Sequence, residues 1–260
     1  MRKAEYFSKD FEWEDLRAQV ENDPSFSYHL LPFEPTSFSL NSVATDQSRS
    51  SAADGSHAWN SFHHRHSSGK FFKERRYLLE EFPELVNWKG NSKVLEVGCG
   101  NGSTVLPILR GNENIVVYAC DCSTEALDRV KETIDASNIA AVEHHFHPFC
   151  CDFSVTTFPT WLACNPCREN FTQTSQQRLT GLYDMTMLRF EEDKRVQFRE
   201  YMRSDGTRSY FFCLDTVRDL FVGAGFKQLE LEYCCVKSVN RRKGKSMQRV
   251  WVHGKFQKPV

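Results

Sequence analysis

The chain has 260 residues, enough to bury a full hydrophobic core, and this length favours one α/β domain with a leader over two large domains. Its formal net charge of −1 excludes a positive field over the whole surface, so nucleic-acid binding would require local basic patches. No apolar run approaches the roughly 20 residues of a membrane span, and Met1–Glu5 lacks the apolar core of a signal peptide. We expect a cytoplasmic or nuclear protein whose ten cysteines are reduced.

The first ninety residues divide into two parts by composition. Residues 1–56 are predicted to be a partly disordered leader, because Ser37–Ser56 is rich in Ser, Asn, Asp and Ala and offers little to bury. From Trp59 to Trp88, aromatic residues are mixed with Lys, Arg and His, which predicts one or two helices. The main domain is therefore expected at 57–260, with N-terminal helices at 57–90.

A βαβ pattern follows and predicts a parallel, Rossmann-like α/β sheet. Its predicted strands and helices are Lys93–Val97, Ser103–Arg110, Ile115–Ala119, Thr124–Ser137 (with Ser123 as N-cap) and Val142–Phe146. A complete doubly wound sheet needs two more strands after Asp152, but residues 154–180 lack the pattern of a strand, a helix and a strand. We therefore expect a sheet without two central strands. The chain closes with predicted elements at Thr216–Val222, Leu229–Ser238 and Gln248–Phe256.

Three glycines between the first strand and helix indicate a cofactor loop. Gly98, Gly100 and Gly102 allow the backbone to turn sharply and to approach a ligand, and Asp121 ends the next strand, where a carboxylate can accept ribose hydroxyls. The spacing Gly-x-Gly-x-Gly favours S-adenosylmethionine over NAD, because Ser103 stands where a dehydrogenase has its third glycine. A purely structural turn is the alternative.

Two further groups of residues have competing interpretations. Asp152 is placed to contact an adenine amino group and Phe153 to pack on the ring; the alternative for Asp152 is a loop N-cap or an Asx turn. Histidines and cysteines suggest zinc, but adjacent Cys150 and Cys151 cannot both point inward from an extended segment, so no metal site is predicted. The residues considered are His144, His145, His147, Cys150, Cys151, Cys164 and Cys167.

The stretch from Lys70 to Arg76 mixes aromatic and basic residues. It is compatible with a packed helix that has one solvated face. It is equally compatible with an RNA contact that combines base stacking and phosphate binding.

Taken together, these segments resemble the methyltransferase-like tRNA enzymes that form 3-methylcytidine in the anticodon loop. The matching segments are Trp59-x-x-Phe62-His63, Phe71–Arg75, Glu81–Leu85, Leu95–Gly100, Cys120–Ser123, Cys151-Asp152, Gly181–Asp184, Arg203–Phe212 and Val239–Arg242. The resemblance implies a class I methyltransferase fold that binds S-adenosylmethionine through Trp59, His63, Gly98, Gly100, Asp121, Asp152 and Phe153, with His63 where many relatives have Tyr. It implies tRNA contacts by Lys73, Arg75, Arg76, Arg208, Arg241 and Arg242. Some members of the family work with seryl-tRNA synthetase, and others choose their tRNAs by themselves or with different helpers.

The resemblance also sets expectations for catalysis. No catalytic nucleophile is expected, since cytidine N3 carries its own lone pair. Asp184 and Asp205 are candidates only for orienting the cytosine amino group. In the family, a strand, a helix and a second strand separate Asp152 from Gly181-Leu182-Tyr183-Asp184, and this block is missing here. The alternative to an active enzyme is therefore a shortened, catalytically impaired form that still binds tRNA.

Overall fold

The computed structural model describes residues 10–33, 47–66, 73–87, 92–152, 155–156, 159, 161, 174–240 and 244–258. These residues form two compact units. The loop unit, which carries the glycine loop, consists of the described residues within 40–172 together with 205–207. The hairpin unit consists of the described residues within 1–39, 173–204 and 208–260.

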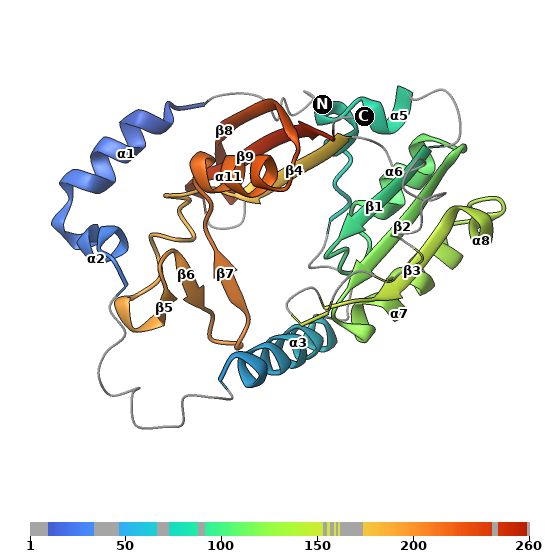
Figure 1. Ribbon diagram of the computed structural model, residues 1–260, viewed down its shortest axis with the longest axis horizontal. Coiled ribbons are helices and arrows are strands. Elements are labelled where there is room, and N and C mark those ends of the chain that lie inside the picture. The colour runs from blue at the N-terminus through green and yellow to red at the C-terminus, as the bar shows by residue number, and fades with distance from the viewer. Residues whose placement is uncertain are drawn as a thin grey trace. The chain divides into compact units, whose positions relative to one another are not determined.

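The loop unit contains a parallel three-stranded sheet in the order β1-β2-β3 (Figure 1). Its strands and their helices are β1 (Ser92–Val97), α6 (Val105–Gly111), β2 (Ile115–Asp121), α7 (Thr124–Asp135), α8 (Val142–His145) and β3 (Phe146–Cys150). Apolar side chains of β2, α6 and α7 form one buried core, which includes Val105, Val117 and Val130. The predicted βαβ order is confirmed, and the Ser123 side chain caps α7 by accepting from Ala126 N at 3.2 Å.

The third strand was predicted at Val142–Phe146, but in the structure it begins only at Phe146. Residues 142–145 form the helical turn α8 after Ala141, whose φ is +50°. Strand β3 begins at Phe146, which pairs with Val117 of β2 and buries its ring in the core. Pro148 disguises this strand in the sequence, but it is tolerated because β3 lies at the edge of its sheet.

Helix α3 (Gln47–Arg65) corrects the prediction of a linker up to Ser56. The helix begins well before Trp59 and has no proline to interrupt it. Its C-terminal half buries Ala58 and Phe62 at helical spacing, so tertiary packing compensates for its polar first half. Two short helices, α4 (Leu78–Glu81) and α5 (Glu84–Asn87), complete this part of the loop unit.

The hairpin unit is built on an antiparallel sheet in the order β4-β9-β8. Its elements are β4 (Thr174–Thr180), the 3₁₀ turn η3 (Glu192–Lys194), α11 (Leu214–Gly223), β8 (Lys227–Asn240) and β9 (Lys245–Gln257). A second small sheet contains β5 (Arg195–Gln197), β6 (Glu200–Met202) and β7 (Arg208–Tyr210). The three predicted C-terminal elements are confirmed.

Strand β4 bears on the prediction that two central strands are missing. It ends directly before Gly181-Leu182-Tyr183-Asp184, where the second of those strands was expected. The prediction of two missing strands is therefore not confirmed. Of residues 153–173, only 155, 156, 159 and 161 belong to the described part of the chain.

The N-terminal residues contribute to the core of the hairpin unit through α1 (Trp13–Asn22), the 3₁₀ turn η1 (Pro24–Phe26) and α2 (Ser27–Leu30). Leu16 and Val20 of α1 are buried. The Trp13 ring stacks on Tyr233 at 4.4 Å between centroids, and its Nε1 donates to the Leu182 carbonyl at 3.3 Å. Residues 10–33 thus pack as part of this unit rather than as a leader.

Within the described ranges, no helix is both long and apolar enough to cross a membrane.

Candidate cofactor site

The glycine loop follows β1 and requires glycine for two different reasons. Gly98, Gly100 and Gly102 have φ values of +70°, +53° and +81°, in the left-handed region that other residues rarely adopt. At Gly102, a Cβ would lie 2.3 Å from Val130 Cγ2, so this glycine lets the loop pack on α7. At Gly98, a Cβ would meet nothing within 4 Å, so this side of the loop is open to a ligand.

Asp121 holds the loop through both of its carboxylate oxygens. Oδ2 accepts from Gly100 N at 2.8 Å, and Oδ1 accepts from Ser123 N at 2.9 Å. The side chain lies at the carboxyl end of β2 and is only 8% exposed. Each oxygen keeps a second lone pair, so Asp121 can accept a ligand hydroxyl while it fixes the loop.

Glu96 lies one residue before the end of β1 and brings a carboxyl group beneath the loop. Its Oε2 atom is buried and makes no hydrogen bond to the described residues. Burial raises the pKa of Glu96 to about 7, although a hydrogen bond from Thr104 and the charge of Arg75 act in the opposite direction. Near neutral pH, this group can therefore exist in either protonation state.

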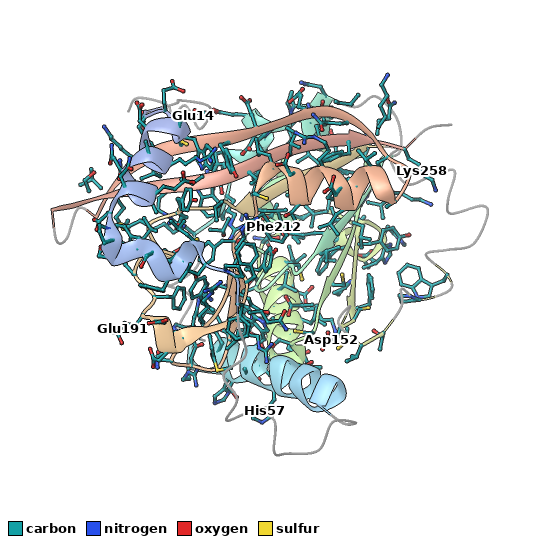
Figure 2. The ribbon with its side chains drawn as sticks, turned by 60° about the vertical axis from the view of Figure 1, so that its left-hand side comes forward. Glu14, His57, Asp152, Glu191, Phe212 and Lys258 are labelled. Atoms are coloured by element: carbon teal, nitrogen blue, oxygen red, sulfur yellow. The ribbon has the colours of Figure 1, made fainter. Side chains whose placement is uncertain are left out.

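Helix α3 is joined to the carboxyl ends of the strands by polar side chains. Ser56 Oγ donates to Asp152 Oδ2, and Figure 2 shows Asp152 beside α3 while His57 points away from the strands. Asn60 Oδ1 accepts from Ser123 Oγ at 2.9 Å and from Glu125 N at 3.2 Å. These contacts place α3 next to both acidic residues that the sequence assigns to the cofactor.

The predicted cofactor residues within the described ranges all lie in the loop unit. His63 is buried, and its Cε1 atom lies 3.4 Å from the position of a Cβ built on Gly100. Burial lowers the pKa of His63, which favours the neutral imidazole. Trp59 lies one turn earlier, with its ring centroid 6.4 Å from that of His63. Phe153 lies outside the described residues.

From the sequence alone, Ser56 and Asn60 were not predicted to belong to the cofactor site. With His63 they follow the spacing i, i+4 and i+7, which places three polar side chains on one face of a helix. That periodicity was detectable, but it becomes informative only once α3 is known to extend back beyond Trp59.

The predicted RNA-binding residues are distributed over both units. Lys73, Arg75 and Arg76 are exposed in the loop unit, where Arg75 N donates to the Ser103 carbonyl at 2.8 Å, close to the glycine loop. Glu74 bridges two guanidinium groups, Arg76 at 2.8 Å and Arg110 at 2.9 Å.

In the hairpin unit, Arg208 pairs with Glu200 at 3.4 Å. Arg241 and Arg242 lie outside the described residues.

Asp184 and Asp205, the two candidates for orienting the base, differ in how accessible their carboxylates are. Asp184 is fully buried, with Oδ2 bound to Arg249 Nε at 2.8 Å and to Val250 N at 2.9 Å. Its Oδ1 accepts from the backbone and the hydroxyl of Thr186. The prediction for Asp184 is therefore wrong, because no part of this carboxylate is accessible to a substrate.

Asp205 is 23% exposed and lies 3.8 Å from Arg65 of α3 within the loop unit. It stays a prediction.

The potential metal ligands do not gather within the described ranges. There, no group of three or more His, Cys, Asp or Glu side chains is arranged to hold a metal ion. Cys164 and Cys167 lie outside those ranges.

The geometry of the loop unit fits a ligand that carries hydroxyl and amino groups. Asp121 ends β2 and Asp152 follows the end of the neighbouring strand β3, and the loop is open at Gly98. The orphaned Oε2 of Glu96 adds a buried polar atom beneath the same loop. Hydroxyl and amino donors of such a ligand would satisfy these acceptors.

The raised pKa of Glu96 predicts a pH-dependent stability. Between its ordinary pKa of 4.5 and its pKa of about 7 in the fold, the folded protein binds more protons than the unfolded chain. Its contribution to the free energy of unfolding therefore falls with rising pH, by about 2–3 kcal/mol between about pH 5 and about pH 8. In urea titrations, Glu96→Gln should become more stable relative to the wild type by that amount over this range.

His29 contributes the opposite pH dependence, because burial lowers its pKa to about 4. Both proteins contain His29, so its contribution cancels when the free energies of unfolding of the variant and the wild type are subtracted. Glu132→Gln, at an exposed position of α7, is the control and should follow the wild type. A constant difference between Glu96→Gln and the wild type over the whole range would contradict the prediction.

Comparisons with known proteins place these features in context. The family model for a methyltransferase domain matches residues 94–185, which include the glycine loop. The chain is 32% identical over 233 residues to the tRNA N(3)-cytidine methyltransferase METTL6 of Rattus norvegicus, covering 77% of this chain and 78% of that protein. It is 31% identical over 252 residues to the tRNA N(3)-methylcytidine methyltransferase Mettl2 of Drosophila melanogaster, covering 85% and 77%.

The fold is also found among solved structures. A SAM-dependent methyltransferase from Anabaena variabilis aligns with a TM-score of 0.51 at 13% identity, covering 78% of this chain and 95% of that one. At this level of identity, the likeness concerns the fold alone.

Proposed function

Since this chain belongs to the class I S-adenosylmethionine-dependent methyltransferase family that includes METTL6 and METTL2, we propose that it methylates N3 of a cytidine in the anticodon loop of a tRNA. The observation that carries the proposal is identity above 30% to tRNA N(3)-cytidine methyltransferases over most of the chain. The glycine loop and the two strand-end acids support the cofactor half of the reaction.

In the proposed reaction, the main task of the protein is to position the cofactor and the base. When bound, S-adenosylmethionine supplies a methyl group on a sulfonium centre. Cytosine N3 carries a lone pair, so the main requirement is a base held in line with that methyl group outside the stacked loop. Trp59, His63, Gly98, Asp121 and Asp152 would bind and orient the cofactor, and Asp205 is the remaining candidate for holding the cytosine amino group.

The tRNA backbone is proposed to contact exposed basic side chains. Lys73, Arg75 and Arg76 lie on one short exposed segment, and Arg75 is next to the end of the glycine loop. Local patches of this kind are what a chain with a net charge of −1 needs for binding phosphates. Arg208, Arg241 and Arg242 are proposed to extend this contact. A protein helper, such as seryl-tRNA synthetase, is part of the proposal through the family resemblance alone.

A catalytically impaired tRNA-binding form is the second candidate, and one observation favours it. In the described part of the loop unit, β1 is an edge strand, and Val97 at its end is 53% exposed. An apolar side chain next to a cofactor loop is normally covered by a neighbouring strand. An incomplete wall here would weaken cofactor binding without removing the basic segment.

Calorimetry with S-adenosylmethionine and nucleoside mass spectrometry of treated tRNA separate the candidates. Cofactor binding together with new 3-methylcytidine is the expected result. Cofactor binding with a different methylated product would overturn the choice of acceptor. Binding of tRNA without detectable binding of the cofactor would establish the impaired form instead.

Charge reversal tests the RNA contact. Arg75→Glu with Arg76→Glu should weaken tRNA binding by about 10-fold or more at moderate salt and flatten its salt dependence, because phosphate contacts release counterions. The control reverses two exposed lysines, Lys131→Glu with Lys227→Glu, and changes the net charge equally. Equal losses in the two double variants, measured by filter binding at several salt concentrations, would reject a specific role for the basic segment.

A further inference from the structure

Asn60 joins two helices of the loop unit through a single oxygen atom. Its Oδ1 accepts from Ser123 Oγ at 2.9 Å and from Glu125 N at 3.2 Å. Glu125 lies in the first turn of α7, where backbone N–H groups have no partner within the helix. Asn60 therefore provides part of the N-terminal cap of α7 from a different helix, α3.

The hydrogen bonds continue from Asn60 to the glycine loop. Ser123 is fully buried, and its N–H donates to Asp121 Oδ1 at 2.9 Å. The other oxygen of Asp121 accepts from Gly100 N at 2.8 Å. A continuous series of bonds thus runs through Asn60, Ser123, Asp121 and Gly100.

The direction of the Ser123 hydroxyl is fixed within this series. Its oxygen accepts from Ala126 N at 3.2 Å, while its proton is donated to Asn60. If Asn60 cannot accept, a buried hydroxyl and a backbone N–H lose their acceptor together. The hydroxyl would then reorient at the residue that binds Asp121.

The same residue ties one face of α3 to the N-terminus of α7. Asn60 lies between Trp59 and His63, and it follows Ser56 by one turn on the same face. Ser56 bonds Asp152, and His63 packs over Gly100. Rotation of α3 would therefore displace the two helix residues assigned to the cofactor.

We propose that Asn60 is a positioning residue for S-adenosylmethionine, acting through Ser123 and Asp121 on the glycine loop and through α3 on His63. The proposal rests on the proposed function insofar as the loop unit binds this cofactor. Loss of the acceptor should raise Kd and KM for S-adenosylmethionine, and leave kcat and the KM for tRNA nearly unchanged.

Two substitutions separate the acceptor from the bulk of the side chain. Asn60→Leu keeps the size and removes the acceptor, and should weaken cofactor binding about 10- to 30-fold. Asn60→Asp keeps the acceptor and puts negative charge at the N-terminus of α7, so its affinity should stay within about threefold of the wild type. Asn114→Leu, an exposed position before β2, is the matched control and should have no effect.

A double-mutant cycle tests the route through Ser123. Ser123→Ala and Asn60→Leu should be non-additive, since either change breaks the same series of bonds. Additive losses in cofactor affinity would overturn this route. Should Asn60→Leu fail to fold, Asn60→Ala takes its place in the comparison.

Hydrogen exchange at the Gly100 amide gives a readout that does not depend on the cofactor. It should be faster in Asn60→Leu, and unchanged in Asn60→Asp and Asn114→Leu. Wild-type protection in Asn60→Leu, or faster exchange throughout the unit together with falls in kcat, would overturn the proposal. A wild type that binds no S-adenosylmethionine would refute the proposed function, while the Gly100 exchange would still decide whether Asn60 positions the loop.

Discussion

Asp184→Asn is expected to lower the free energy of unfolding of the hairpin unit by about 3–5 kcal/mol, the largest stability effect that we predict. The carboxylate is fully buried and accepts hydrogen bonds on both oxygens, including the one from Arg249. An amide would turn its NH₂ group toward N–H donors and would leave the guanidinium without its counter-charge. Urea titration of the purified protein measures the loss.

Asp193→Asn is the matched control for Asp184→Asn. Asp193 is 62% exposed and pairs with the neighbouring Lys194, so its substitution should cost less than about 0.5 kcal/mol. If Asp184→Asn were as mild as this control, the interpretation of Asp184 as a structural residue would be wrong. Its position in the Gly181–Asp184 motif would then again suggest a role in binding the base.

Asp121→Asn is expected to weaken binding of S-adenosylmethionine by about 100-fold, equivalent to about 2.7 kcal/mol. In the fold, the two oxygens accept from Gly100 N and Ser123 N. An amide nitrogen in either position would face an N–H donor, so the loop would lose one anchor and the ligand would lose a charged acceptor. Titration calorimetry of the purified protein measures the change.

The control for Asp121→Asn is Asp135→Asn, at the exposed last residue of α7. It removes the same charge from the same unit and should bind the cofactor as the wild type does. A loss of less than about threefold in Asp121→Asn would mean that the strand-end acid does not contact the ligand. In that case, Asp121 would serve only the geometry of the loop.

The structural features that were predicted correctly are determined by residues close together in the sequence. The glycine loop, the Ser123 cap and strand β2 are specified by residues only a few positions apart, so local patterns were sufficient. The contacts of α3 were not predictable in this way, because Ser56 and Asp152 are 96 residues apart and Asn60 and Ser123 are 63 apart.

Long-range packing explains the two clearest errors. Residues 1–56 were predicted to be a partly disordered leader, because the partners of Trp13 in the hairpin unit come more than 150 residues later. Asp184 looked functional because an acidic residue in a motif suggests chemistry, whereas its burial depends on Arg249, 65 residues further along. The third strand was predicted too early for a local reason, since residues 142–145 form the helical turn α8 and the strand begins at Phe146.

The packing of α1 into the hairpin unit has a consequence for the order of folding during synthesis. The described part of the loop unit lies almost entirely within 47–152, so it can begin to fold as soon as that stretch leaves the ribosome. The Trp13 ring must wait for Leu182, 169 residues later, and then for Tyr233. The buried side chains of α1 likewise pack in a cluster whose other members begin at Leu182 and end at Val250. We therefore expect the hairpin unit to complete its fold after the loop unit.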